Sequence, residues 1–156
     1  MPSLVDIFRF VNIFCAAITA GGLVMVLMGV YPAMRTFEPK MTARIHQAID
    51  LLPDSYMRPS TILSGVCGVL ILVLHGARTP LILAYYVIGI LGTLGIIVTS
   101  EFFNVRINAV VKSWAQKDYV APEYPAMLDR WHRFHIVRTS SSLLALTCYL
   151  VAELTR

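Results

Sequence analysis

A segment without a single charged side chain lies in the second half of this sequence. Residues 80–100 (PLILAYYVIGILGTLGIIVTS) contain no Asp, Glu, Lys or Arg. About 20 consecutive apolar residues are enough for a helix to cross the hydrocarbon core of a bilayer. A second such run extends from about residue 10 to residue 31 (FVNIFCAAITAGGLVMVLMGVY). The sequence therefore predicts a chain that crosses a membrane more than once.

The composition supports this prediction and excludes several classes of protein. Hydrophobic residues make up 57% of the 156-residue chain and charged residues only 14%, with a mean hydropathy of +0.69. Soluble domains average about 25% charged residues, so this chain has too few charges to cover a soluble globule of its size. A cytosolic enzyme, a nucleic-acid-binding module and a disordered chain are therefore excluded. Despite the net charge of +4, nucleic acid is not an expected partner.

Two further apolar segments complete the predicted fold. One runs from about residue 61 to 75 and is short; the other runs from about 136 to 154 and is interrupted by Arg138. Together with the spans at about 10–31 and 80–100, they predict a single domain over residues 1–156. The predicted fold class is all-α, an integral membrane antiparallel four-helix bundle. Small residues recur in the spans and allow close helix packing, either within the bundle or against another subunit.

The loop between the first two spans has the pattern of a short amphipathic helix. Pro39 suits the first position of a helix, and the residues after it predict a helix lying at the membrane interface. His46 falls on this element, either as a solvated surface histidine or as a residue that approaches His135. The predicted apolar stripe is Met41, Ile45, Ala48, Ile49 and Leu52, opposite Arg44, Gln47 and Asp50.

Most of the Lys and Arg residues fall on one side of the predicted bundle. Four spans place the two long loops, about residues 32–60 and 101–133, on the side opposite to both termini. The positive-inside rule then places the long loops in the cytoplasm and the termini outside, in a bacterial inner (cell) membrane. Cations that serve a site would bias the same count. The cations on the long-loop side are Arg35, Lys40, Arg44, Arg58, Arg106, Lys112, Lys117, Arg130, Arg133 and Arg138, against Arg9, Arg78 and Arg156 on the other.

The third helix is predicted to continue beyond the membrane and to carry a polar face. In EFFNVRINAVVKSW, Glu101, Asn104 and Asn108 are spaced i, i+3 and i+7, so they share one side of a helix. A carboxylate and two amides therefore point the same way, just past the uncharged span. We expect this face to contribute to a site on the long-loop side.

The fourth helix carries a matching face where it begins, on the same side of the membrane. Trp131, His135, Arg138 and Ser142 are spaced i, i+4, i+7 and i+11, which again places them on one side of a helix. Charged and polar groups near hydrocarbon usually face a bundle interior or a wet cavity, so the two faces predict a polar pocket. The structural alternative is that Glu101 simply pairs with Arg138 while Trp131 anchors the interface.

Metal and haem sites are disfavoured by the same geometry. His132 and His135 are three residues apart, but His135 shares its face with Trp131 and not with His132. A bis-histidine haem needs His75 as the second ligand, and His75 ends the second span on the opposite membrane side. We therefore expect no metal site and no cofactor.

Several of these residues together resemble a known family. The run Asn104-x-x-x-Asn108, Trp114 and Trp131-x-x-x-His135-x-x-Arg138, with Tyr31-Pro32-Ala33 after the first span, resembles the anthrone-oxygenase-like integral membrane family. The resemblance covers nearly the whole chain and is most distinctive over residues 101–140. It implies a four-helix membrane protein. Some members oxidise an anthrone carbon with O₂ to an anthraquinone without metal or flavin, and most have no assigned activity.

The resemblance implies pocket residues, and the chemistry of an anthrone suggests their roles. An anthrone has an acidic methylene whose carbanion can transfer an electron to O₂, so the protein needs a base and an oxyanion stabiliser. We expect His135 to be the base and the other catalytic groups to stabilise the phenolate. The expected catalytic residues are His135, Asn104, Asn108 and Arg138, and the expected binding residues are Glu101, Trp114, Trp131, Ser142 and His46.

A non-enzymatic function is the alternative interpretation. The same pocket could hold a lipid headgroup or a quinone carbonyl in an accessory subunit, or in a lipid- or quinone-binding module of a larger membrane complex. The expected partners are thus the membrane and a hydrophobic small molecule, quinone or lipid, with a homo-oligomer or a larger membrane complex as possible assemblies. A transporter is disfavoured because no span is broken at the bilayer midplane.

Overall fold

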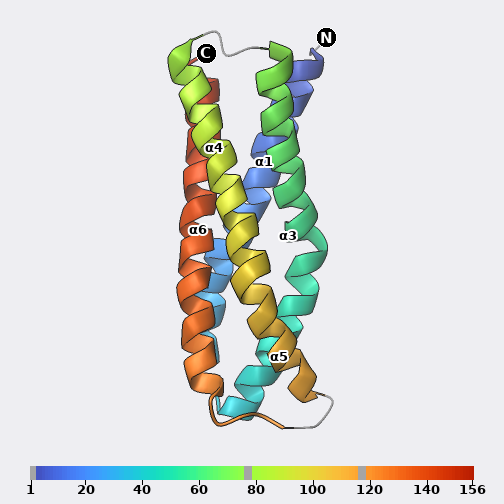
Figure 1. The fold of residues 1–156 in the computed structure, drawn as a ribbon, viewed down its shortest axis with the longest axis vertical. Helices are drawn as coiled ribbons and strands as arrows, with labels where there is room; N and C mark the ends of the chain where they lie inside the picture. The colour runs from blue at the N-terminus through green and yellow to red at the C-terminus, as the bar shows by residue number, and fades with distance from the viewer. Residues whose placement is uncertain (1–2, 76–78, 116–118) are drawn as a thin grey trace.

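Four helical rods, residues 4–34, 39–75, 80–115 and 124–154, run antiparallel along the length of the molecule (Figure 1). The computed structural model describes residues 3–75, 79–115 and 119–156, without the side chains of 51–54, 75 and 115. Within these ranges every regular element is helical. The elements are α1 (Leu4–Met25), η1 (Val26–Val30), α2 (Tyr31–Met34), α3 (Pro39–His75), α4 (Pro80–Thr99), η2 (Ser100–Asn104), α5 (Val105–Ala115) and α6 (Tyr124–Leu154).

Each rod contains a stretch long and apolar enough to cross a membrane. These stretches are Leu4–Met34, Ser55–Leu74, Pro80–Trp114 and Tyr124–Leu154. The prediction of an all-α membrane four-helix bundle is confirmed. Both termini lie at one end, and the places where α2 leads to α3 and α5 leads to α6 lie at the other (Figure 1). We call these the terminal end and the loop end.

The helix starts follow from local sequence. At the beginning of α1, the Ser3 side chain accepts from the backbone N–H of Asp6, while the Asp6 carboxylate accepts from the Ser3 N–H, which is a capping box. At the beginning of α4, the Thr79 hydroxyl accepts from the Ile82 N–H, and Pro80 occupies the first turn. These caps set where the first and third rods begin.

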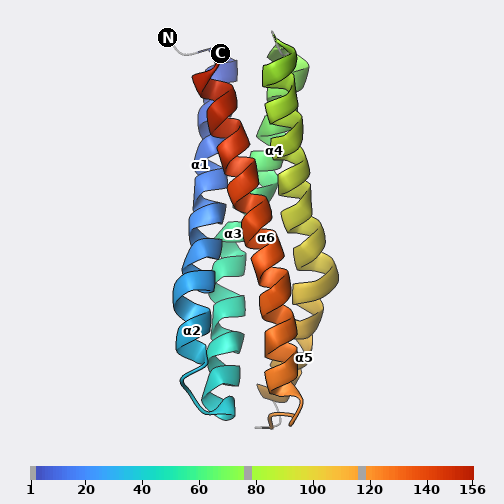
Figure 2. The same ribbon diagram turned by 90° about the vertical axis from the view of Figure 1, so that its left-hand side faces the viewer.

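The prediction of a separate interfacial helix after Pro39 was wrong. These residues form the first part of α3, which continues unbroken to His75 and runs beside α1 through the bundle (Figure 2). Its buried face consists of Thr42, Ala43 and His46, whereas Met41 is 45% exposed. The segment packs against α5 and α6 instead of lying on a membrane surface. Of the predicted apolar stripe, Ile45 and Ile49 pack against the core, Met41 and Ala48 are exposed, and the side chain of Leu52 lies outside the described residues.

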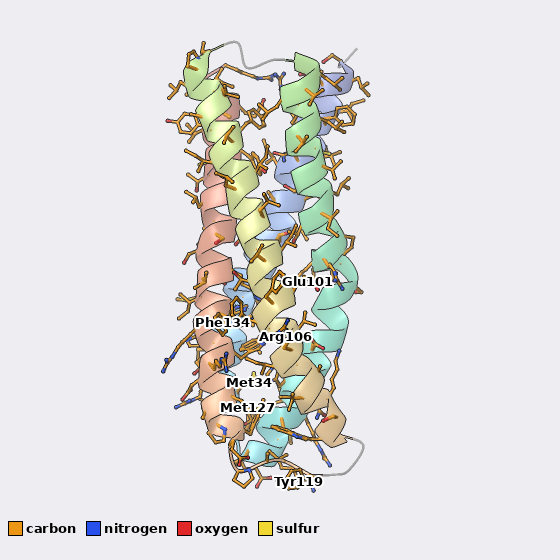
Figure 3. The ribbon with its side chains drawn as sticks, in the orientation of Figure 1. Met34, Glu101, Arg106, Tyr119, Met127 and Phe134 are labelled. Carbon is orange, nitrogen blue, oxygen red and sulfur yellow. The ribbon has the colours of Figure 1, made fainter. Side chains whose placement is uncertain are left out.

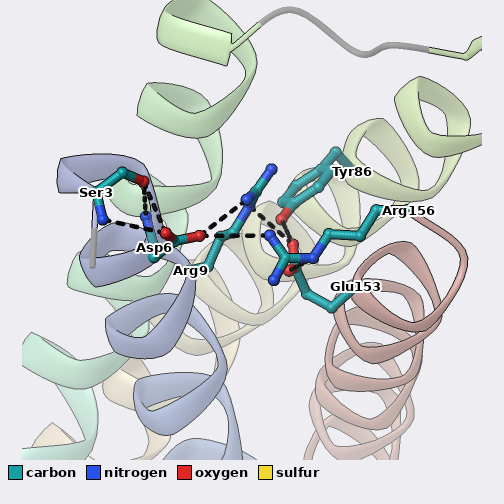
Figure 4. Close-up of polar contacts among 6 residues, drawn as sticks. All are labelled: Ser3, Asp6, Arg9, Tyr86, Glu153 and Arg156. Atoms are coloured by element: carbon teal, nitrogen blue, oxygen red, sulfur yellow. Dashed lines mark hydrogen bonds and ion pairs between the residues drawn. The ribbon is translucent and has the colours of Figure 1, made fainter. Parts of the chain in front are cut away.

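The interior has two apolar clusters, one at each end. The loop-end cluster is rich in large aromatic side chains, among them Trp114, Tyr124 and Trp131. The terminal-end cluster contains Tyr86 and Tyr149 packed on small residues. Beyond the second cluster, Glu153 forms ion pairs with Arg9 at 3.3 Å and with Arg156 at 3.1 Å and accepts from the Tyr86 hydroxyl (Figure 4). The bundle is therefore closed by aromatic packing at one end and by charges at the other.

Two π-helical turns interrupt the rods near the loop-end cluster. The turn η1 follows α1, and η2 joins α4 to α5. A π turn inserts an extra residue into a helix, and such turns are frequent at functional sites. Because the insertion rotates the residues that follow it, the two rods do not keep one regular packing face past Val26 and Ser100.

Candidate functional site

A cavity of about 240 Å³ lies at the level of the two π turns. It borders the loop-end cluster, with Val26 and Trp131 common to both. All four rods contribute to its wall. The lining residues are Thr19, Leu23, Val26, His46, Ile49, Asp50, Met57, Arg58, Thr61, Ile62, Ile96, Ile97, Ser100, Glu101, Asn104, Val105, Asn108, Trp131 and Arg138.

The cavity has a buried wall and an exposed side. Leu23 on α1, His46 on α3 and Trp131 on α6 are each at most 2% exposed. By contrast, Ile62 on α3 is 50% exposed and Val105 at the start of α5 is 38% exposed. The cavity therefore opens laterally, between α3 and the α4–α5 rod. Glu101, labelled in Figure 3, lies on that side.

The buried wall presents two polar groups that have no protein partner. Asn104 is 1% exposed, and neither its amide oxygen nor its amide nitrogen is hydrogen-bonded. The indole Nε1 of Trp131, which is 2% exposed, also lacks a partner. Buried polar atoms are nearly always paired, because an unpaired one costs about 1–3 kcal/mol. These two groups are therefore available to a molecule inside the cavity.

His46 belongs to a chain of hydrogen bonds that reaches the surface. The Asn108 amide N–H donates to Asp50, whose carboxylate can only accept, so the Asn108 amide oxygen must face His46. His46 Nε2 therefore carries the proton and donates to Asn108 Oδ1 at 3.1 Å. Its Nδ1 faces the Tyr124 hydroxyl at 3.3 Å. At the outer end, Asp50 pairs with Lys112, which is 44% exposed.

Burial lowers the pKa of His46 below its ordinary value of 6.5, while the hydrogen bond to Asn108 and the charge of Asp50 offset part of this effect. The ring is therefore neutral near pH 7, with the tautomer that Asn108 requires. Its edge also lies against Trp131, with ring centroids 4.8 Å apart. The prediction of a solvated surface histidine was wrong, because α3 carries His46 into the bundle.

His135 lies behind the cavity wall rather than on it. Its ring stacks on Trp131 with centroids 5.0 Å apart. Its Nε2 donates to the backbone carbonyl of Leu23 at 3.0 Å, and its Nδ1 accepts from Arg138 Nε at 2.9 Å. Both ring nitrogens are thus engaged. The Arg138 guanidinium lies 5.9 Å from the centre of a Trp131 ring, so His135 holds both the indole and the guanidinium in place.

The structure brings most of the predicted pocket residues together. Glu101, Asn104, Asn108, Trp131, Arg138 and His46 line the cavity, whereas His135, Trp114 and Ser142 do not. Trp114 packs edge-on against Tyr124 in the loop-end cluster, with centroids 5.7 Å apart. Ser142 borders a separate void of about 10 Å³ deeper in the bundle.

The predicted alternative pairing of Glu101 with Arg138 was wrong, since Glu101 pairs with Arg58 on α3. Sequence reasoning counted Arg58 only as a topological charge and did not identify it as a site residue. The available signal was a cation directly before Pro59, next to the second apolar span. Asp50 was likewise assigned to a solvated face, yet its side chain is only 10% exposed.

Possible metal ligands are spread apart. Among the residues that the structure describes, no three His, Cys, Asp or Glu side chains gather closely enough to hold a metal ion. His132 stacks on Tyr31 with centroids 3.5 Å apart, whereas His135 stacks on Trp131. The side chain of His75, considered above as a haem ligand, lies outside the described residues.

Comparison with known proteins supports the resemblance seen in the sequence. A family model described as anthrone oxygenase matches residues 53–148. Comparison with curated proteins and with solved structures finds no match. The matched range includes Asn104, Asn108, Trp131 and Arg138 of the cavity, while His46 and Asp50 precede it. Because the match covers more than half of the chain, this protein belongs to the anthrone oxygenase family.

Proposed function

We propose that this protein oxidises a phenolic aromatic of the anthrone type with O₂ inside the cavity. The observation that carries the proposal is the pair of unpartnered polar groups, the Asn104 amide and the Trp131 indole N–H, in the wall of a largely apolar cavity. Ligand pockets typically combine apolar walls with a few placed polar groups. Membership of the anthrone oxygenase family supports the reaction class.

The size of the cavity suits a fused-ring ligand. An apolar cavity of about 150 Å³ accommodates a single benzene ring, and the volume here is about 240 Å³. Leu23, Ile49 and Ile97 provide apolar contacts, and Trp131 provides a hydrogen-bond donor without a protein partner. A planar molecule with a carbonyl or phenol oxygen at one edge fits this combination.

The proposed reaction uses O₂ as the oxidant. A base removes one proton from the methylene, and the electron pair delocalises onto the carbonyl oxygen. One electron passes to O₂, and the carbon radical and superoxide then form a C–O bond to give a peroxide, which takes up a proton. Loss of the second methylene hydrogen with O–O cleavage leaves a new carbonyl and releases water. One O₂ is consumed for each quinone formed.

The cavity residues take the following roles in this proposal. Trp131 Nε1–H and the Asn104 amide N–H donate to the developing oxyanion, and Arg138 adds positive charge beside them. His135, which we expected from the sequence to be the base, acts as a positioning residue because both its nitrogens are engaged. His46 is the proposed base, since it is neutral and lines the cavity; its Nδ1 lone pair, which faces the Tyr124 hydroxyl at 3.3 Å, takes the proton when that hydroxyl turns away.

The test is O₂ consumption by the purified protein in lipid nanodiscs with anthrone as substrate. We expect one O₂ per anthraquinone, at a rate well above that with heat-unfolded protein. Trp131→Phe keeps an aromatic ring beside His135 and removes the N–H together with part of the indole, and Asn104→Leu keeps the approximate volume. Each should lower kcat by about 10²-fold, the typical effect of losing one oxyanion donor. Asp129→Asn, which alters an exposed pair with Arg35 outside the cavity, should leave the rate unchanged.

Two results contradict the proposal. One is a wild-type rate equal to that of the heat-unfolded control, and the other is a wild-type rate in both Trp131→Phe and Asn104→Leu. Binding of anthraquinone without any consumption of O₂ favours the second candidate, a quinone-binding module. The same two N–H donors support that candidate, because they suit a quinone carbonyl and it requires no base.

A further inference from the structure

An ion pair bridges the open side of the cavity. Arg58 on α3 and Glu101 on η2 pair across the opening, and both line the cavity. Their side chains are 54% and 37% exposed, respectively. The groups deeper in the cavity, such as Asn104 and Trp131, are almost fully buried. Arg58 and Glu101 therefore lie where a ligand enters from this side.

The opening lies at one edge of the bilayer rather than in its middle. Glu101 follows Pro80 by about 30 Å along a helix that rises about 1.5 Å per residue, and the hydrocarbon core is also about 30 Å thick. With Pro80 at the opposite edge, Glu101 reaches the boundary between hydrocarbon and headgroups. Exposed Ile62 flanks the pair on α3. The opening therefore faces lipid and headgroups together, where amphipathic aromatic molecules accumulate.

Both partners of the pair stand on irregular helical segments. Pro59, directly after Arg58, has no N–H to donate to the carbonyl one turn earlier, which weakens the helix at that point. Glu101 belongs to the π turn η2. The backbone on each side of the opening is thus less constrained than a regular helix, so the two side chains can separate without unfolding a rod.

We propose that Arg58 and Glu101 form the lateral entrance of the cavity and select its ligand. The favoured ligand is an apolar ring system with an acidic substituent, a carboxylate or an ionised phenol, which arrives from the bilayer surface. Such a substituent replaces Glu101 as the partner of Arg58, so the guanidinium is never left unpaired during entrance. This inference rests on the proposed function, because it takes the cavity to be the ligand site.

Tryptophan fluorescence tests the proposal by measuring ligand binding, so it does not depend on enzyme turnover. The chain has two tryptophans, and Trp114→Phe leaves only Trp131, in the cavity wall, as the reporter. The probes are anthraquinone and anthraquinone-2-carboxylate, added to protein in phosphatidylcholine nanodiscs. Quenching gives the association rate and the Kd for each probe. If Trp114→Phe does not fold by circular dichroism, the wild-type background with both tryptophans serves instead.

The two charges should act in opposite directions on the acidic probe. Arg58→Gln should weaken binding of the carboxylate by about 10-fold or more, relative to anthraquinone. Glu101→Gln should strengthen carboxylate binding several-fold, because Arg58 no longer has a competing partner. Both variants remove the ion pair between residues 58 and 101 and should therefore raise the association rate of neutral anthraquinone. The matched control is Asp129→Asn, which breaks the exposed pair with Arg35 away from the cavity and should change none of these values.

The possible outcomes test the proposed entrance and the proposed oxygenase activity separately or together. Quenching that is equal in wild type, Arg58→Gln and Glu101→Gln, or altered alike for both probes, overturns the entrance and leaves the proposed function standing. The expected opposite effects, found in a protein that consumes no O₂, support the entrance and overturn the oxygenase. Absence of quenching by both probes in every protein overturns both proposals.

Discussion

At the scale of single residues, the main result is that two histidines, His135 and His46, have different positions relative to the cavity. His135 was the stronger candidate from the sequence, because it shares a helix face with Trp131 and Arg138. In the structure it supports those two residues from behind, whereas His46 reaches the cavity. A helix face specifies a direction, but it does not specify whether the side chain at that position reaches the cavity or lies behind its wall.

The buried state of His46 leads to a prediction about pH. Its pKa is lowered in the folded protein from an ordinary value of 6.5, so below about pH 6.5 the unfolded state binds more protons and stability falls. We expect wild type to lose more thermal stability between pH 7.5 and pH 5 than His46→Gln, by at most about 1.4 kcal/mol per pH unit. Thermal unfolding in detergent at both pH values measures this difference.

An identical loss of stability in wild type and His46→Gln would contradict that prediction. The groups that face His46 are Asn108 on α5, Tyr124, Trp131 and Arg138 on α6, and Asp50 on α3 with its partner Lys112. The comparison therefore covers only the range from pH 7.5 to pH 5, in which His46 gains its proton in the unfolded state.

At the scale of elements, close helix contact and helix irregularity occur at different levels of the bundle. Along α4, Gly89 and Gly92 allow α6 to approach, and a Cβ at Gly92 would lie 2.9 Å from the backbone carbonyl oxygen of Ser141. Toward the loop end, the π turns η1 and η2 and Pro59 disturb three of the rods. Regular helices pack without large voids, so the cavity forms where regularity is lost.

Gly92→Ala tests the close contact between α4 and α6. The added methyl group meets backbone, which cannot rotate away as a side chain can, so the helices must separate locally. We expect a loss of about 1–3 kcal/mol of stability, the usual cost of overpacking, measured by thermal or denaturant unfolding in detergent. The control is Gly21→Ala on α1, where no atom lies within 4 Å of the new Cβ. Equal stability of the two variants would exclude this packing.

At the scale of the whole molecule, charges hold the terminal end together. Arg9 on α1, Tyr86 on α4 and Arg156 after α6 all contact the Glu153 carboxylate, which is 14% exposed (Figure 4). These contacts join three rods at the terminal end, far from the loop-end aromatic cluster. Charged groups thus contribute to stability at the terminal end, and aromatic packing contributes at the loop end.

Glu153→Gln should destabilise the bundle from this end. The amide keeps the size of the side chain but removes the charge that Arg9 and Arg156 share, and hydrogen bonds to charged groups contribute about 1.5–3 kcal/mol. A lower thermal midpoint in detergent is the expected result. Asp129→Asn, at an exposed ion pair, should cost less than about 1 kcal/mol. A smaller loss in Glu153→Gln than in Asp129→Asn would contradict this account.

The orientation of the bundle is a prediction about the whole chain. From the excess of Lys and Arg at the loop end, we propose that this end is cytoplasmic in a bacterial inner membrane and that the termini are outside. The native cysteines Cys15, Cys67 and Cys148 are buried, so we expect only the added cysteine to react with the labelling reagent. Thr155→Cys should react with a membrane-impermeant maleimide on intact cells, and Thr36→Cys should react only after lysis. The reverse pattern would invert the topology.

Much of the fold and part of the site could be predicted without coordinates. Hydrophobic runs identify the four rods because a bilayer tolerates no unpaired backbone, and helical spacing brought Glu101, Asn104 and Asn108 to the side where Trp131 and Arg138 begin α6. Spacing was only partly right for α3, where Ile45 and Ile49 of the predicted stripe pack against the core but Met41 and Ala48 are exposed. There the choice of face depends on what α5 and α6 present, which local periodicity does not contain.

The sequence by itself determined that this chain is a helical membrane bundle with polar groups concentrated toward one end. Its apolar runs and scarce charges leave no other stable arrangement. Only the tertiary structure decided that His46 and Arg58 belong to the cavity, that His135 supports its wall, and that the opening lies between α3 and the α4–α5 rod. The physical reason is that hydrophobic transfer is a property of each segment alone, whereas hydrogen bonds, ion pairs and cavities depend on where several segments meet.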